Sequence, residues 1–300
     1  MKALTNFFDR IVQRFLPDAF LFAVILTLIV YVMGVIFTDS SPLQMISHWG
    51  GGFWDLLDFA MQMALIVTTG YILANTSIVR RMLTKISKLA NTPAQAIILV
   101  TIVASIASII NYGFGLVVGA LMAIYVARRV PSANFRLLVA SAYSGFLLWH
   151  GGFSASAPLL VATEGHFLED TMGTIPVMDT LFSSFNIFII IVLLVTLPIL
   201  NWLLLRTQDP LKQQNHYDWE SNEYTEEEKS EGEQEDSPAT RIENSQILSL
   251  LIGIMGMAYV VYHFVQNGFD LNLHIVIFIF LFLGIILHRT PRRFLNSVGG

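Results

Sequence analysis

Long apolar stretches separated by short polar segments dominate the hydrophobic pattern of this 300-residue chain. A helix needs roughly 20 apolar residues to cross the hydrocarbon core of a bilayer. Stretches of that size or longer, all without Asp, Glu, Lys or Arg, lie at 19–38, 59–76, 94–127, 137–163, 180–205 and 247–266, with a weaker one at 272–287. The pattern predicts an all-α polytopic membrane protein with about six to eight membrane segments.

The stretch 94–127 is too long for a single span. Its 34 uncharged residues would form one helix of about 51 Å, and basic residues flank both ends. The chain is therefore expected to enter the membrane and return, with a break at Asn111-Tyr112-Gly113-Phe114-Gly115. The two legs have about 17 and 12 residues, and the short second leg favours a re-entrant hairpin. Two short tilted spans joined by a tight turn are the alternative.

The stretch 137–163 is interrupted as well. Gly145, Gly151, Gly152 and Pro158 fall within it, and proline cannot donate a backbone hydrogen bond. Backbone groups freed at membrane depth persist only where protein or a wet cavity satisfies them, so we expect a broken helix near a binding site. Two broken elements close together in sequence indicate a transporter site. A kinked, purely structural helix pair is the alternative.

Composition and charge support a membrane protein with a defined orientation. Hydrophobic residues make up 54% and charged residues 13% of the chain, against about 25% charged in soluble domains. The bases fall within 2–14, 80–88, 128–136, 206–241 and 289–293, and none lies in 39–52, 164–179 or 267–271. The positive-inside rule then predicts a cytoplasmic N-terminus. The absence of cysteine excludes disulfides, and the composition excludes a nucleic-acid-binding domain.

The same patterns divide the chain into four parts. Residues 1–18 are predicted to form an interfacial helix, because apolar residues recur there at helical spacing beside Arg10 and Arg14. Residues 19–205 form a first membrane half with the hairpin and the broken helix. Residues 206–246 are an acidic, disordered cytoplasmic linker, and 247–300 begin a second membrane half. A partner-binding role of the linker is the alternative.

Neutral polar residues are the candidates for holding a substrate. No Lys or Arg lies inside a predicted span, so an anion would be bound by backbone N–H groups at half-helix N-termini and by polar side chains. The predicted substrate-binding residues are Asn111, Gly113, Gly115, Gly151, Gly152, Ser154 and Ser156. Glycines let the backbone approach a ligand closely. Alternatively they pack helices together, as the spacing of Gly115 and Gly119 indicates.

Three titratable residues are candidates for ion or proton coupling. His150 lies within the broken helix and could relay protons, or be a hydrogen-bonded structural residue. Asp55 and Asp58 share a helical face and could capture a proton or cation, or be solvated at the interface. No metal site and no cofactor beyond a coupling H⁺ or Na⁺ is predicted. Common metalloprotease, hydrolase and Walker motifs are absent from the sequence, so we expect neither an enzyme nor an ATP-driven pump.

Several strings of residues resemble the short-chain fatty acid transporters of the AtoE type. The main ones are Asn111 to Ala120, Val126 to Pro131 and Trp149 to Ser154; further matches in order are Arg14 to Asp18, Trp49 to Trp54, Met61 to Leu65 and Asp179 to Asn186. The resemblance is dense over 1–205 and thins over the linker. It implies secondary uptake of small monocarboxylates such as acetoacetate or butyrate through a bacterial cytoplasmic membrane.

The resemblance also implies an inverted-repeat architecture in which the Asn111 and Gly151 regions meet at one site. Usual family members extend further at the C-terminus, so a second hairpin and broken helix are expected beyond Gly300. The expected partners are a small carboxylate, the lipid bilayer and, as an open alternative to a monomer, further copies of the chain. Two other functions stay open: an anion channel lined by the breaks, and a non-transporting scaffold that acts through the acidic linker.

Overall fold

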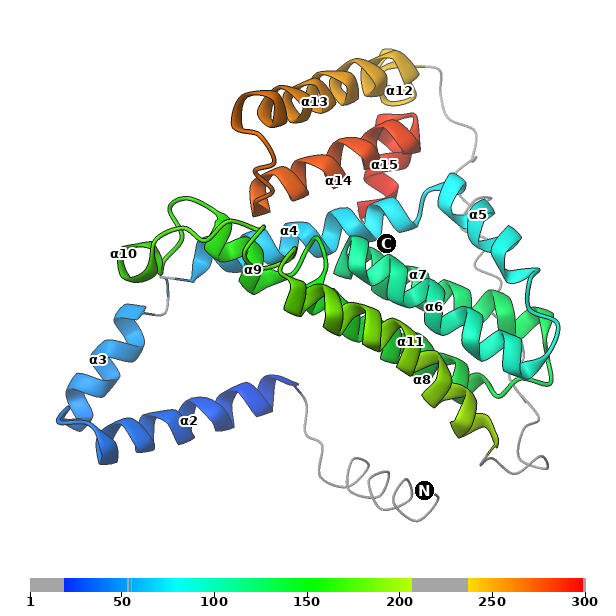
Figure 1. Cartoon of the computed structure of the whole chain (residues 1–300). Coiled ribbons are helices and arrows are strands. Elements are labelled where there is room, and N and C mark those ends of the chain that lie inside the picture. The colour runs from blue at the N-terminus through cyan, green and yellow to red at the C-terminus, as the bar shows by residue number, and fades with distance from the viewer. Residues whose placement is uncertain (1–18, 53, 55, 207–236, 299–300) are drawn as a thin grey trace. The chain divides into compact units, whose positions relative to one another are not determined.

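The computed structural model describes residues 19–52, 54, 56–206 and 237–298, and every regular element among them is a helix (Figure 1). The chain divides into two compact units, with the boundary between Ala60 and Met61. In the described part of the chain, seven helical stretches are long and apolar enough to cross a membrane: Phe20–Phe37, Leu57–Ala74, Pro93–Ile110, Tyr112–Arg129, Phe135–Ala162, Ser184–Arg206 and Gln246–Asn267. This confirms the prediction of an all-α polytopic membrane protein.

The first unit consists of α2 (Ala19–Phe37), α3 (Pro42–Gly52) and the first turn of α4 (Leu57–Ala74). Helix α3 folds back beside α2, where the Tyr31 hydroxyl donates to the Pro42 carbonyl at 3.3 Å. Gly34 faces the side chain of Met45. The apolar side chains of α2 are largely exposed, as is expected of a helix whose solvent is lipid. The predicted interfacial helix 1–18 lies outside the described residues.

The second unit contains the rest of α4 and all later helices. These are α5 (Ser77–Ser87), α6 (Pro93–Ile110), α7 (Tyr112–Arg129), α8 (Phe135–Phe146), the 3₁₀ helix η1 (Leu147–Gly151), α9 (Ser156–Ala162), α10 (Glu169–Met172), α11 (Ser184–Arg206), α12 (Pro238–Glu243), α13 (Gln246–Asn267), α14 (Leu273–His288) and α15 (Pro291–Val298). Of the predicted linker, Pro238–Glu243 forms α12, and residues 207–236 lie outside the described part.

Helix α6 lies at the centre of the second unit, packed against α7, α8 and α11 (Figure 1). Small residues allow these helices to approach closely, because a Cβ added to Gly119 of α7 would lie 3.3 Å from the Ala104 Cβ and 3.4 Å from the Ala142 Cβ. Fully buried Ile97 and Met122 fill the space along the same helices. Helices α13 and α14 form a second antiparallel pair.

The first hairpin consists of α6 and α7, joined at the single residue Asn111. The expected hairpin is present, but the estimate of a 12-residue second leg was wrong, because α7 has 18 residues. The helix begins directly after Asn111, whose side chain caps it, and includes both Gly113 and Gly115. It also continues through the bases Arg128 and Arg129. Both legs, at about 27 Å, are long enough for a span, so length no longer favours a re-entrant hairpin over two short spans.

The predicted break in 137–163 is confirmed. Helix α8 ends at Phe146, η1 follows, and α9 begins only at Ser156. Extended backbone at Gly152 separates the last two elements. Pro158 is accommodated in the first turn of α9, where its missing N–H costs no helical hydrogen bond.

Candidate functional site

The tip of the first hairpin is a buried amide side chain. Asn111 is fully buried, has an extended backbone (φ −160°) and caps α7 by accepting the Phe114 N–H at its Oδ1 at 2.9 Å. Its backbone carbonyl accepts the Gly115 N–H at 2.8 Å. The Nδ2 atom of Asn111, by contrast, is buried without an acceptor among the described residues. A buried amide donor without an acceptor is unfavourable, so this atom is available to a ligand.

The break between η1 and α9 lies directly against this tip. The Phe153 N–H donates to the Ile109 carbonyl at 2.7 Å, and the fully buried Ser154 accepts the Tyr112 N–H at its Oγ at 2.8 Å. These two bonds supply partners to backbone groups that the interrupted helices leave free. The structure therefore brings the two predicted breaks together.

Protein atoms occupy the space beside the tip glycines. A Cβ on Gly113 would lie 2.6 Å from the Val67 carbonyl oxygen of α4, and one on Gly115 would collide with Ser108 of α6. In the same way Gly152 faces the Ile109 backbone. In this conformation these glycines serve close helix packing, and a ligand could contact them only after neighbouring helices have moved.

Two further residues connect the site to neighbouring helices and were missed in the sequence. Tyr112 donates its hydroxyl proton to the Met63 carbonyl of α4 at 2.7 Å. Asn186, at the start of α11, donates through Nδ2 to the Gly151 carbonyl at 3.1 Å and to the Leu181 carbonyl at 2.7 Å. Both residues belong to strings that carry the family resemblance, which is the signal that could have identified them.

A second buried polar group lies deeper between α6, α8 and α11. Asn201 donates through Nδ2 to the Thr101 hydroxyl at 3.0 Å and to the Ser144 hydroxyl at 2.7 Å. Asn201 and Thr101 are buried, and α11 is otherwise almost entirely apolar. An isolated amide in a membrane helix is costly unless it is paired, and this alone could have identified Asn201 in the sequence.

The other predicted residues make no hydrogen bond to the buried amide among the described residues, or are not described. His150 is exposed, and its Nδ1 is 3.1 Å from the Leu147 carbonyl. Ser156 is half-buried at the start of α9. Asp58 is exposed in the first turn of α4, in the first unit, and Asp55 lies outside the described residues. Within the described residues, no hydrogen bond joins His150 or Ser156 to the tip.

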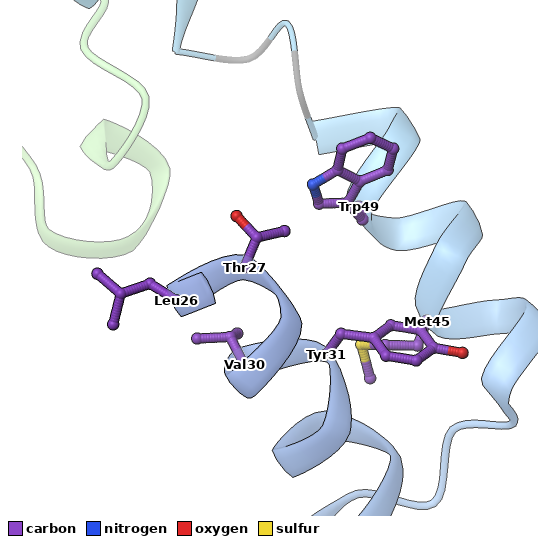
Figure 2. A pocket seen from close by; sticks show the side chains of 6 residues that line it. All are labelled: Leu26, Thr27, Val30, Tyr31, Met45 and Trp49. Carbon is purple, nitrogen blue, oxygen red and sulfur yellow. The ribbon is translucent and has the colours of Figure 1, made fainter. Parts of the chain in front are cut away.

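The first unit carries a groove that we do not regard as a functional site. It has a volume of about 360 Å³ and lies between α2 and α3, lined by Leu26, Thr27, Val30, Tyr31, Met45 and Trp49 (Figure 2). The lining has no charged side chain, and apolar surface is ordinary on a helix that faces lipid. No group of three His, Cys, Asp or Glu residues that could hold a metal ion is found in the described part of the chain.

Apolar spans with two helix breaks in contact at a buried amide are typical of a multi-pass membrane transporter. The sequence model described as "Short chain fatty acid transporter" matches residues 1–299, and the chain belongs to this family. It is a family of transporters and not of enzymes, in agreement with the expectation from the sequence.

Two curated relatives carry the name "Putative short-chain fatty acid transporter". The protein of Escherichia coli (strain K12) is 42% identical over 296 residues, which cover 98% of this chain and 66% of the relative. The protein of Haemophilus influenzae (strain ATCC 51907 / DSM 11121 / KW20 / Rd) is 40% identical over 313 residues, which cover 99% of this chain and 68% of the relative. The chain thus spans about two thirds of the length of these relatives. No solved structure matches it.

Proposed function

We propose that the protein is part or all of a secondary transporter that carries short-chain monocarboxylates, of the acetoacetate and butyrate class, through a bacterial cytoplasmic membrane. The family and the names of both relatives support the substrate class. The confinement of basic residues to alternate connecting segments supports a cytoplasmic N-terminus.

The observation that carries the proposal is the unpaired Nδ2 of Asn111. A carboxylate oxygen of the substrate would accept this N–H, at the positive end of the dipole of α7. The Ser154 hydroxyl, whose oxygen already accepts the Tyr112 N–H, has its own proton left to donate to the second oxygen. The glycines around the tip let the substrate approach the backbone once the helices separate.

The substrate charge has to be balanced, because the tip offers only neutral donors. A co-transported H⁺ or Na⁺ would provide this balance, with the proton carried on the carboxylic acid itself or the sodium ion bound at exposed carbonyls. The exposure of His150 and Asp58 lends no support to a coupling role for either residue.

Substrate entry would require α4 to move away from the tip. Gly70 of α4 lies against the Asn111 Oδ1 and the Phe114 backbone nitrogen. The Tyr112 hydroxyl also donates a hydrogen bond to the Met63 carbonyl of α4. Breaking the Tyr112 bond and separating Gly70 from the tip would expose the Asn111 amide. Such movement of one helix group against another is the general basis of alternating access.

The test is uptake of labelled butyrate and acetoacetate into proteoliposomes under an imposed proton or sodium gradient. This chain and the Escherichia coli relative are reconstituted side by side, each with and without an alanine at the position of Asn111. The proposal predicts saturable uptake driven by one gradient and lost in the alanine variants. Conductance without saturation would indicate a channel, and unchanged uptake in both alanine variants would exclude the tip as the binding site.

A further inference from the structure

Basic side chains converge where α4, α5, α14 and α15 meet. The buried His288, at the end of α14, pairs through Nε2 with the Ile72 carbonyl of α4 at 2.9 Å. Its ring also lies edge-on to Phe294 of α15, with the ring centroids 6.2 Å apart. The charges of Arg80 on α5 and Arg293 on α15 are both within electrostatic reach of this ring. Two guanidinium groups from separate helices therefore lie near one buried histidine.

The described residues do not balance this charge. Arg80 donates through Nη2 to the Asn75 side chain at 2.9 Å, but its Nε is buried without an acceptor. Neither Arg80 nor Arg293 has an acidic partner in the described part of the chain. Glu243 of α12 instead pairs with Arg292, the neighbour of Arg293 in sequence, at 3.8 Å. A buried guanidinium N–H without an acceptor, with a second guanidinium acting on the same histidine, favours binding of an anion.

The amphipathic character of α5 favours the headgroup of a membrane lipid as the bound anion. Helix α5 buries Val79 and Leu83 on one face and exposes Arg81 on the other, as is typical of a helix that lies in the bilayer interface. Guanidinium groups bind phosphate oxygens in a bidentate manner, and basic pockets between membrane helices bind lipid headgroups. We propose that Arg80 and Arg293 form a binding site for the phosphate group of an anionic phospholipid, next to His288.

The test measures thermal unfolding of the purified chain in detergent with added dioleoyl phosphatidylglycerol. Dioleoyl phosphatidylcholine and inorganic phosphate at matched concentrations serve as comparison ligands. The anionic lipid is expected to raise Tm by about 4 °C or more, and the two comparison ligands by much less. Arg80→Gln and Arg293→Gln should each remove most of this shift. Arg293 is exposed, so its variant tests the site even if the Arg80 variant fails to fold.

Arg81→Gln is the matched control, because Arg81 lies next to Arg80 on α5 but, in the described part of the chain, hydrogen-bonds to Ser77 alone, through its Nε and Nη2. This variant should keep the full lipid shift. An equal loss in Arg81→Gln and Arg293→Gln would overturn the site in favour of diffuse surface charge. A full shift with inorganic phosphate alone would overturn the lipid as the source of the phosphate. A shift that occurs only after deletion of residues 221–236 would show that the acidic segment of the chain itself occupies the basic residues.

Discussion

The two helical hairpins of the second unit begin their second helices in the same way, yet among the described residues only one of the two capping side chains has a buried amide donor without an acceptor. Asn111 caps α7, and Asn272 caps α14 by accepting the Ile275 N–H at 3.1 Å. In both, a hydroxyl from the region around α9 accepts the next backbone N–H. Ser154 accepts from Tyr112 at 2.8 Å, and Thr163 accepts from Leu273 at 3.2 Å.

The difference lies in the remaining amide atom of each cap. The Nδ2 of Asn272 donates to Asp270 at 2.9 Å, and the Asp270 carboxylate also contacts Nε2 of His263 on α13 at 3.1 Å. The Nδ2 of Asn111 is buried and has no such partner among the residues that the structure describes. Both amide atoms of Asn272 are therefore paired within the protein, whereas Asn111 has an N–H donor left for a ligand. Capping stabilises both helices, so the free donor and not the cap distinguishes the candidate site.

Replacing each cap with alanine would test this comparison with the largest effect. Both Asn111→Ala and Asn272→Ala should lose about 1 kcal/mol of helix stability. Only Asn111→Ala should also reduce uptake of labelled butyrate, by about tenfold or more, because it alone removes a donor to the carboxylate. The measurements are proteoliposome uptake and thermal unfolding. Equal losses of uptake in the two variants would mean that the caps act only through stability.

Alanine substitutions at the tip glycine Gly113 and at Gly284, near the end of α14 in the second hairpin, should differ in their effect on protein stability. In Gly113→Ala the new methyl group meets the Val67 backbone of α4, which cannot rotate away, and a cost of about 1–3 kcal/mol is expected. In Gly284→Ala it meets the Ile72 Cγ2 at 3.2 Å, a side-chain atom that can shift. Thermal unfolding should show a clearly larger decrease of Tm for Gly113→Ala. A larger decrease for Gly284→Ala would contradict the close approach of α4 to the tip.

Substitutions of Ser154 and Thr163, whose hydroxyls each accept an N–H at a helix N-terminus, distinguish a loss of protein stability from a loss of substrate binding. Ser154→Ala and Thr163→Val each remove the acceptor of one buried N–H and should destabilise the protein by about 1 kcal/mol. Only Ser154→Ala should raise the KM for uptake, by a factor of about three to ten, since only Ser154 lies beside the free amide. Concentration-dependent uptake measures this. The idea fails if Thr163→Val raises the KM by the same factor.

The smallest effect is expected at His150. Its exposed ring lies outside the hydrogen bonds of the tip, so His150→Gln should change butyrate uptake by less than about twofold at any pH between 5 and 8. Uptake under a proton gradient is the measurement. Abolished proton-driven uptake with intact protein folding would instead establish His150 as the relay.

The spans, the hairpin and the broken helix could be predicted from the sequence. The length of an uncharged stretch can be compared with the thickness of the bilayer, and glycine or proline in the middle of a span interrupts its helix. The predicted length of the second hairpin leg was too short. Gly113 and Gly115 look like loop residues in the sequence, but α7 begins directly after the capping residue Asn111 and includes both. The contact between the breaks came from the resemblance. Asn186 and Asn201 were missed although each carries a signal in the sequence; what the sequence does not give is their partners, 35 to 100 residues away. No local pattern records which helices will be neighbours.

The distant partners of α6 and α7 also bear on the order of membrane insertion. When the ribosome has delivered only this hairpin, the Tyr112 N–H still lacks Ser154, 42 residues further along the chain. The Thr101 hydroxyl, by contrast, already donates to the Ile97 carbonyl within α6 and gains the Asn201 donor only 100 residues later. A newly made hairpin would therefore expose the Tyr112 N–H to lipid until α8, η1 and Ser154 arrive. The insertion machinery would need to shelter the hairpin until this segment has been made, and premature release into the bilayer would favour misassembly.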